Sequence, residues 1–164
     1  MTRPRPSIVA ISLAAALLLV IVALVAWRTS PAPASDALGI LGPTRVARGA
    51  TLYATNCASC HGVKGEGEPN WKTPNADITY PAPPHDATGH SWHHSDKLLL
   101  EIIRDGGARY ESATFKSRMP AWGDRLTDEE IRALVAYVKT LWGPEERRFQ
   151  TEASARDPLL DAVP

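Results

Sequence analysis

Both cysteines of this 164-residue chain lie in one five-residue segment, Cys57-Ala58-Ser59-Cys60-His61. Neither therefore has a third cysteine with which it could form a separate structural disulfide. A Cys-x-x-Cys-His segment serves only a few kinds of chemistry, and each kind needs its own surrounding fold. This segment limits the folds available to the chain more strongly than any other feature of the sequence.

Three chemistries suit the spacing of the two cysteines. A thioredoxin-like redox pair follows a strand in a βαβ unit, whereas a helical pattern precedes Cys57. A structural zinc site needs four ligands, and the fourth would have to come from distant histidines. In covalent haem attachment, two thiols bind the vinyl-derived carbons on one porphyrin edge, and the adjacent His61 gives a ring nitrogen to iron. The segment favours this third chemistry.

A haem iron with one histidine ligand has a sixth position that a second side chain can fill. Apart from the first residue, Met119 is the only methionine, and it lies in the loop sequence Arg118-Met119-Pro120-Ala121-Trp122-Gly123. Pro120 restricts Met119 to an extended backbone, which can hold the thioether out from the loop. The alternative is that Met119 fills a gap in the core, as methionine often does. We expect it to be the second axial ligand.

The apolar residues recur at helical spacing in three segments, and no pair of strands is evident, so we predict an all-α fold. The first helix contains a glycine, Gly49, which costs about 1 kcal/mol relative to alanine and suggests that another backbone passes close by. The third helix has a capping box formed by Thr127 and Glu130. The predicted helices run from residues 43 or 44 to about 55, from 94 or 95 to 106, and from 127 to 143.

The N-terminus predicts a membrane anchor. Residues 8–27 are uncharged and long enough as a helix to span a hydrocarbon core of about 30 Å. Arg3 and Arg5 place residues 1–7 in the cytoplasm, and thus the rest of the chain on the far side of the membrane. A cleaved signal peptide, with a cleavage site near Ala32-Pro33-Ala34, is the alternative. The Pro- and Ala-rich residues 28–42 predict a linker.

The charge balance gives no support for binding to nucleic acid. The chain has 18 Lys and Arg residues against 18 Asp and Glu residues, without the clustered basic face that such binding needs. Residues 144–164 lack a sustained apolar period, and we expect them to form a peripheral or disordered tail. The predicted compact domain is therefore residues 43–143.

Taken together, these motifs resemble the class I single-haem c-type cytochromes of the membrane-anchored bacterial type. The resemblance covers about residues 43–143, and it implies a cytochrome c fold with three or more helices around one covalently bound haem c. It also implies that Cys57 and Cys60 anchor the haem and that His61 and Met119 are the axial ligands. The residues that carry it are Gly49-x-x-x-Tyr53-x-x-x-Cys57-Ala58-Ser59-Cys60-His61-Gly62, Met119-Pro120 and Leu134-x-x-Tyr137-x-x-x-Leu141-Trp142.

The resemblance implies a function as well as a fold. Proteins of this family carry single electrons and are not enzymes, and His/Met ligation raises the reduction potential of the iron. The family further implies that the first and last helices cross beside the haem, near Gly49, Tyr53 and Tyr137. We therefore expect a respiratory electron carrier on the periplasmic side of the bacterial cytoplasmic membrane. Its partners would be redox donor and acceptor proteins, such as a terminal oxidase or a quinol-oxidising complex.

Four histidines between residues 85 and 94 depart from the simplest pattern of this family: His85, His90, His93 and His94. They could bind copper or zinc, since imidazole suits both metals, which would make the protein a metal-handling module. One of them could instead replace Met119 at iron, or the loop could serve a haem enzyme or sensor with an open site. The simplest interpretation is a loop that borders the haem crevice. Three arginines, Arg104, Arg109 and Arg118, are either partners of the haem propionates or surface charges.

Overall fold

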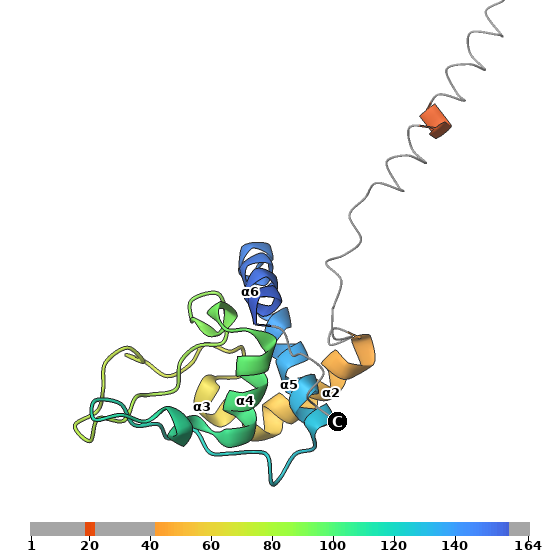
Figure 1. Ribbon diagram of the computed structural model, residues 1–164. Coiled ribbons are helices and arrows are strands. Elements are labelled where there is room, and N and C mark those ends of the chain that lie inside the picture. The colour runs from red at the N-terminus through yellow and green to blue at the C-terminus, as the bar shows by residue number, and fades with distance from the viewer. Residues whose placement is uncertain (1–18, 22–41, 158–164) are drawn as a thin grey trace, which may run out of the picture. The chain divides into compact units, whose positions relative to one another are not determined.

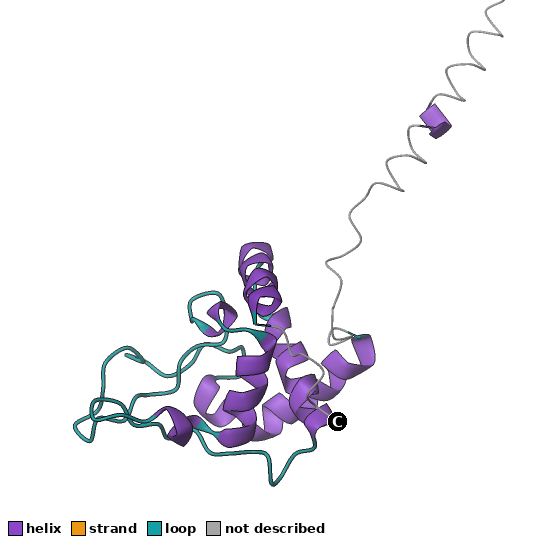
Figure 2. Ribbon diagram, in the orientation of Figure 1, coloured by secondary structure: helices purple, strands orange, loops and turns teal. Residues whose placement is uncertain are grey.

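A computed structural model describes residues 19–21 and 42–157 of the chain. Within residues 42–157 the chain forms helices and loops but no strand, only two isolated bridges, so the predicted all-α fold is confirmed there (Figure 2). The helices are α2 (Pro43–Asn56), α3 (Ala58–His61), α4 (Asp96–Asp105), α5 (Asp128–Thr140) and α6 (Pro144–Arg156), with short 3-10 turns η1 (Ser91–His93) and η2 (Gly107–Tyr110) (Figure 1).

The three predicted helices form, and local capping explains where two of them begin. The Ser95 hydroxyl accepts a hydrogen bond from the Leu98 amide at the start of α4. At the start of α5, the Thr127 hydroxyl accepts from the Glu130 amide, and the Glu130 carboxylate accepts from the Thr127 amide. Each contact satisfies amide groups that the first turn of a helix leaves without a partner. The capping box that the sequence predicts is therefore confirmed.

Helices α2 and α5 pack against each other at Gly49, side by side in Figure 1. A Cβ atom on Gly49 would lie 1.9 Å from the Ala133 carbonyl oxygen and 2.9 Å from the Tyr137 Cβ. Only a residue without a side chain lets the backbones of α2 and α5 approach this closely. The prediction that another backbone passes close to Gly49 is therefore confirmed. The buried core around the crossing includes Leu52, Tyr53, Leu99, Leu100, Ile131, Ala133, Leu134, Val135, Val138 and Trp142.

The structure corrects the prediction for the C-terminal residues. We expected residues 144–164 to form a peripheral or disordered tail, but α6 runs from Pro144 to Arg156 and packs on η1 and α4; residues 158–164 lie outside the described residues. Phe149 contacts Trp92 edge to face, with ring centroids 5.4 Å apart. The side chain of Gln150 is completely buried. Because α6 is attached largely through polar groups, it has no apolar period by which the sequence could reveal it.

A buried polar network joins α4, α5 and α6. Lys139 Nζ lies 2.7 Å and 3.0 Å from the two carboxylate oxygens of Asp96. Gln150 Nε2 donates to one of the same oxygens at 2.7 Å. The side chains of Lys139 and Asp96 are only 10% and 11% exposed, so each depends on the other for the partner that water would otherwise supply.

Asp96→Asn should destabilise the protein by about 3 kcal/mol, because it leaves a largely buried Lys139 ammonium without a counter-charge. Urea unfolding of the haem-loaded protein would measure this loss of free energy of unfolding. Asp105→Asn is the matched control on the same helix, since Asp105 forms an exposed ion pair with Arg109 and should change stability by less than about 0.5 kcal/mol. Equal losses in the two variants would contradict the prediction.

The predicted membrane anchor, residues 8–27, lies outside the described residues except for the helical residues 19–21. The predicted cytoplasmic segment 1–7 and the predicted linker 28–42 lie outside them too, apart from Gly42. In the part of the chain that the structure describes, no helix has both the length and the apolar character needed to cross a membrane.

Candidate functional site

The cysteine motif forms a single helical turn directly after α2. Cys57 ends α2, and its carbonyl oxygen accepts hydrogen bonds from the Cys60 and His61 amides at 3.1 Å and 2.9 Å. Both cysteines are free thiols; Cys57 is partly buried and Cys60 is exposed. Burial, with a smaller contribution from Cys60, raises the pKa of Cys57 to about 11. The turn thus places two free thiols and the His61 imidazole within five consecutive residues.

The His61 ring is oriented by a backbone carbonyl from a distant loop. Its Nδ1 atom lies 2.8 Å from the carbonyl oxygen of Pro83, and the residue is 8% exposed. A carbonyl can only accept, so Nδ1 carries the proton and Nε2 keeps its lone pair. Burial lowers the pKa of His61, although the bond to Pro83 acts in the opposite direction. The residue is therefore suited to act as a neutral imidazole ligand through Nε2.

The loop that carries Pro83 is held close to the motif by Gly67. The Gly67 amide donates to the His61 carbonyl at 2.8 Å, and its φ of +70° lies in the region that favours glycine. A Cβ atom there would lie 2.5 Å from the Pro84 nitrogen. The neighbouring Glu68 amide donates to the Ala82 carbonyl at 2.9 Å. This close backbone approach brings the Pro83 carbonyl within reach of His61.

Met119 lies in a separate loop that is bound to the end of α4. The Met119 carbonyl accepts from the Gly107 amide at 3.0 Å, and its own amide donates to the Ser117 hydroxyl at 3.1 Å. Further along, the Gly123 amide donates to the Arg104 carbonyl at 2.9 Å. Met119 is partly buried. The backbone on both sides of the thioether is thus held in place, on a different segment from the cysteine motif.

The ring of His85 contacts the ring of His61 directly, and the sequence did not predict this contact. Its ring stacks on the His61 ring with centroids 4.0 Å apart and an angle of 23° between the planes. Its Nδ1 lies 3.1 Å from the Ser91 hydroxyl. Burial, followed by the proximity of His61 and His90, lowers the pKa of His85 well below its usual value. Nothing in the sequence separates His85 from the other three histidines of this loop.

The other three histidines of this loop have different ring neighbours from His85. His90 stacks on Trp71 at 5.4 Å and meets His94 edge to face at 5.3 Å, while His93 contacts Trp92 at 3.8 Å. Within residues 19–21 and 42–157, no group of three or more His, Cys, Asp or Glu side chains is placed to hold a metal ion.

Three arginines were considered above as possible partners of the haem propionates. Each of them forms an ion pair with a carboxylate of the protein. All three ion pairs are at least partly exposed, so each contributes little to stability. The pairs are Arg104 with Asp128 at 2.8 Å, Arg109 with Asp105 at 2.5 Å, and Arg118 with Glu68 at 3.1 Å.

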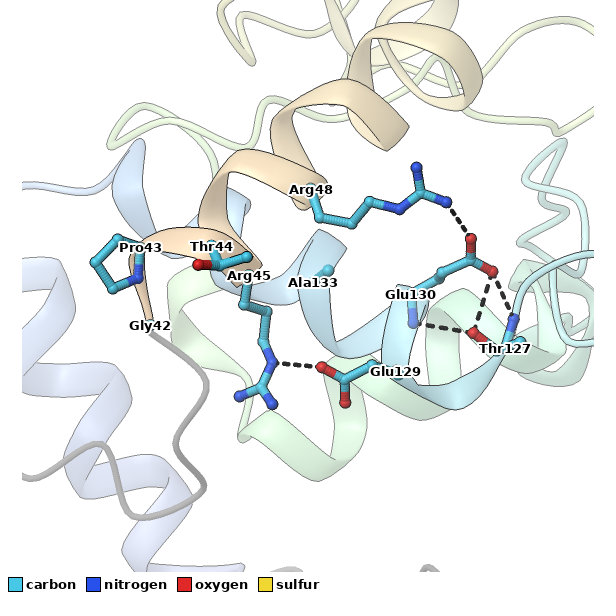
Figure 3. Close-up of a pocket in the computed structure, with 9 residues that line it drawn as sticks. All are labelled: Gly42, Pro43, Thr44, Arg45, Arg48, Thr127, Glu129, Glu130 and Ala133. Carbon is cyan, nitrogen blue, oxygen red and sulfur yellow. Dashed lines mark hydrogen bonds and ion pairs between the residues drawn. The ribbon is translucent and has the colours of Figure 1, made fainter.

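A pocket of about 570 Å³ lies between the first turns of α2 and α5, but it includes no residue of the cysteine motif (Figure 3). Its charged side chains are paired across the two helices. Arg45 binds Glu129 at 2.7 Å, and Arg48 binds Glu130 at 2.5 Å. The pocket is therefore open space beside the helix crossing, and the chemistry of the molecule is concentrated at His61 instead.

Comparisons with known proteins agree with this arrangement. Residues 46–142 match the family model for cytochrome c. Chloroplastic cytochrome c6 of Chlamydomonas reinhardtii is 35% identical over 98 residues, which are 57% of this chain and 52% of that protein. Cytochrome c6 of Bryopsis maxima is 36% identical over 96 residues, or 55% of this chain and 84% of that protein.

A third relative is a subunit of a larger assembly. The cbb3-type cytochrome c oxidase subunit FixP of Azorhizobium caulinodans is 34% identical over 98 residues, which are 58% of this chain and 27% of that subunit. The matched region thus spans about half of the Chlamydomonas protein and about a quarter of the oxidase subunit. Because the family model spans well over half of the chain, the chain belongs to the cytochrome c family, whose members carry electrons on covalently bound haem c.

Proposed function

We propose that the protein is a one-electron carrier with a single haem c, ligated by His61 and Met119. The observation that carries this proposal is the hydrogen bond from His61 Nδ1 to the Pro83 carbonyl at 2.8 Å. It fixes the tautomer in which Nε2 is the ligating atom, and a ligand histidine commonly needs such an outer partner. His61 therefore has the protonation state and the orientation of an axial ligand.

The two thiols suit the covalent attachment of haem. Cys57 and Cys60 lie in one helical turn with His61 and form no disulfide. In our proposal, each sulfur forms a thioether bond to one edge of the porphyrin, which supplies an iron that cycles between the ferric and ferrous states. The protein would hold the iron through His61, whose own burial limits the access of water to that ligand.

Met119 completes the proposed ligand set. The hydrogen bonds of Gly107 and Ser117 to its backbone hold the Met119 loop beside the end of α4, which supports a fixed backbone position for this ligand. A Met/His pair raises the reduction potential relative to other axial pairs. With both axial positions filled, the iron has no open site for a substrate, which suits an electron carrier rather than an enzyme.

The partners we propose are redox proteins of a respiratory membrane. Several relatives are named as subunits of cbb3-type cytochrome c oxidases, which supports a terminal oxidase as one candidate partner. The apolar residues 8–27 would tether the haem domain to the periplasmic face of the bacterial cytoplasmic membrane, a geometry that suits short-range exchange with membrane complexes. Co-purification of the full-length protein with such a complex would test this assignment.

Visible spectra of the oxidised and reduced holoprotein would test the ligand set. We expect c-type haem bands and the weak long-wavelength charge-transfer band that marks methionine sulfur on ferric iron. In Met119→Ala this band should disappear while the haem stays covalently attached, because the thioether bonds do not involve Met119.

The control is Ser117→Ala, which removes the hydroxyl that holds the Met119 amide but leaves the thioether in place. It should keep the band. If the wild-type protein lacks the band, or if Met119→Ala leaves the ferric spectrum unchanged, Met119 is not the ligand. An open sixth position would then favour the ligand-binding enzyme or sensor, whereas a histidine in that position would keep the carrier function with a different ligand.

A further inference from the structure

The His61 ring has two different constraints in the structure. Its Nδ1 edge is bound by the Pro83 carbonyl, and its face is covered by the ring of His85 at a centroid distance of 4.0 Å. One hydrogen bond tolerates a tilt of tens of degrees before it weakens steeply. A flat ring stacked nearly parallel to the imidazole is a second and independent limit on how far His61 can turn.

His85 is itself held firmly, from three directions. Its backbone amide donates to the Gly65 carbonyl at 2.7 Å, and its carbonyl accepts from Trp142 Nε1 at 2.9 Å. Its ring is bound through Nδ1 to the hydroxyl of the buried Ser91. The two backbone bonds fix the position of the residue, and the bond to Ser91 limits the rotation of its ring.

We propose that His85 is a positioning residue for the proximal ligand: its stacked ring sets the rotation of the His61 imidazole and thereby tunes the reduction potential of the haem iron. This inference rests on the proposed axial role of His61. Partners in the outer shell of a metal site orient the ligand and adjust the electronics of the metal. The orientation of an imidazole plane also decides which iron orbitals its π electrons overlap.

An aliphatic side chain could fill the same space but could not impose a plane on His61. The relevant property of His85 is thus its flat ring at a fixed angle of 23° to His61. His93, in the same loop, lies against Trp92 and Phe149, so it is a histidine of the same type with different ring neighbours.

Full-length holoprotein carrying His85→Leu, His85→Phe or His93→Leu would test the proposal. Two measurements apply: the midpoint potential, and the proton NMR shifts of the four haem methyl groups in the ferric state, whose pattern follows the axial ligand planes. We expect His85→Leu to redistribute the methyl shifts and to change the equilibrium constant for reduction by about threefold or more. His85→Phe should restore most of the wild-type shift pattern, and His93→Leu should alter neither measurement.

A wild-type methyl pattern in His85→Leu would overturn the proposal, as would equal changes in the leucine and phenylalanine variants. If His85→Leu does not take up haem, Ser91→Ala should show a smaller change in the methyl pattern, because it frees the His85 ring; no change there would also overturn the proposal. A wild-type spectrum without a histidine-ligated haem would refute the proposed function, and this inference with it. Normal ligation with unresponsive variants would refute this inference alone.

Discussion

The double variant Cys57→Ala, Cys60→Ala should lose all of its haem on extraction with acidified acetone, whereas the wild-type protein should keep it. The extraction breaks iron–ligand bonds but not thioether bonds, so haem retained afterwards is covalently attached. Both thiols are free and lie in the same helical turn as His61, and they are the only two in the chain. Without them, only the axial ligands would hold the porphyrin.

Two kinds of control separate attachment from folding. Ser59→Ala changes the exposed residue between the cysteines and should keep all of the haem. Each single variant, Cys57→Ala or Cys60→Ala, should keep haem through the one remaining thioether bond. The absorbance of the protein fraction after extraction measures the haem retained by the wild-type protein and by each of the four variants. Extraction-resistant haem in the double variant would rule out both cysteines as the anchors.

Gly49→Leu should be the most destabilising substitution in the helical core, with an expected loss of about 4 kcal/mol in the free energy of unfolding. A Cβ atom at this position would lie 1.9 Å from the Ala133 carbonyl oxygen, which belongs to the backbone of α5. A flexible side chain could move aside, but a helix backbone cannot, so α2 and α5 would have to separate. Such a loss is a large share of the stability of a small domain.

The leucine itself would favour α2 by roughly 1 kcal/mol through helix propensity, so the measured loss underestimates the steric cost. Chemical denaturation of the haem-loaded protein would measure it. Gly42→Ser is the matched control, because no atom lies within 4 Å of a Cβ placed there and serine is favoured at the start of a helix. A Gly49→Leu protein within about 1 kcal/mol of wild type would show that the crossing can open at little cost.

The features that depend on neighbouring residues could be predicted from the sequence. Helix α5 begins at the capping box of Thr127 and Glu130, and α4 begins after Ser95, because these contacts span only three residues. The cysteine motif and the glycine at the helix crossing were also evident, since each requires particular residue types at particular spacings. The haem anchors and the ligands His61 and Met119 could be proposed on the same basis.

Other features depend on contacts between segments that are far apart in the chain and share no periodic pattern. Pro83, whose carbonyl binds His61, lies 22 positions after it in the sequence. Every residue has a backbone carbonyl, so the residue types do not indicate which carbonyl will bind His61. The same applies to the stacking of His85 on His61, because four histidines in one loop are chemically alike until the fold gives each its neighbours. Helix α6 packs through Gln150 and Ser154, so its polar sequence resembles that of an exposed tail. Local sequence thus determined which groups we propose to bind haem, whereas long-range packing determined how His61 is held, because the orientation of its ring depends on partners that come together only on folding.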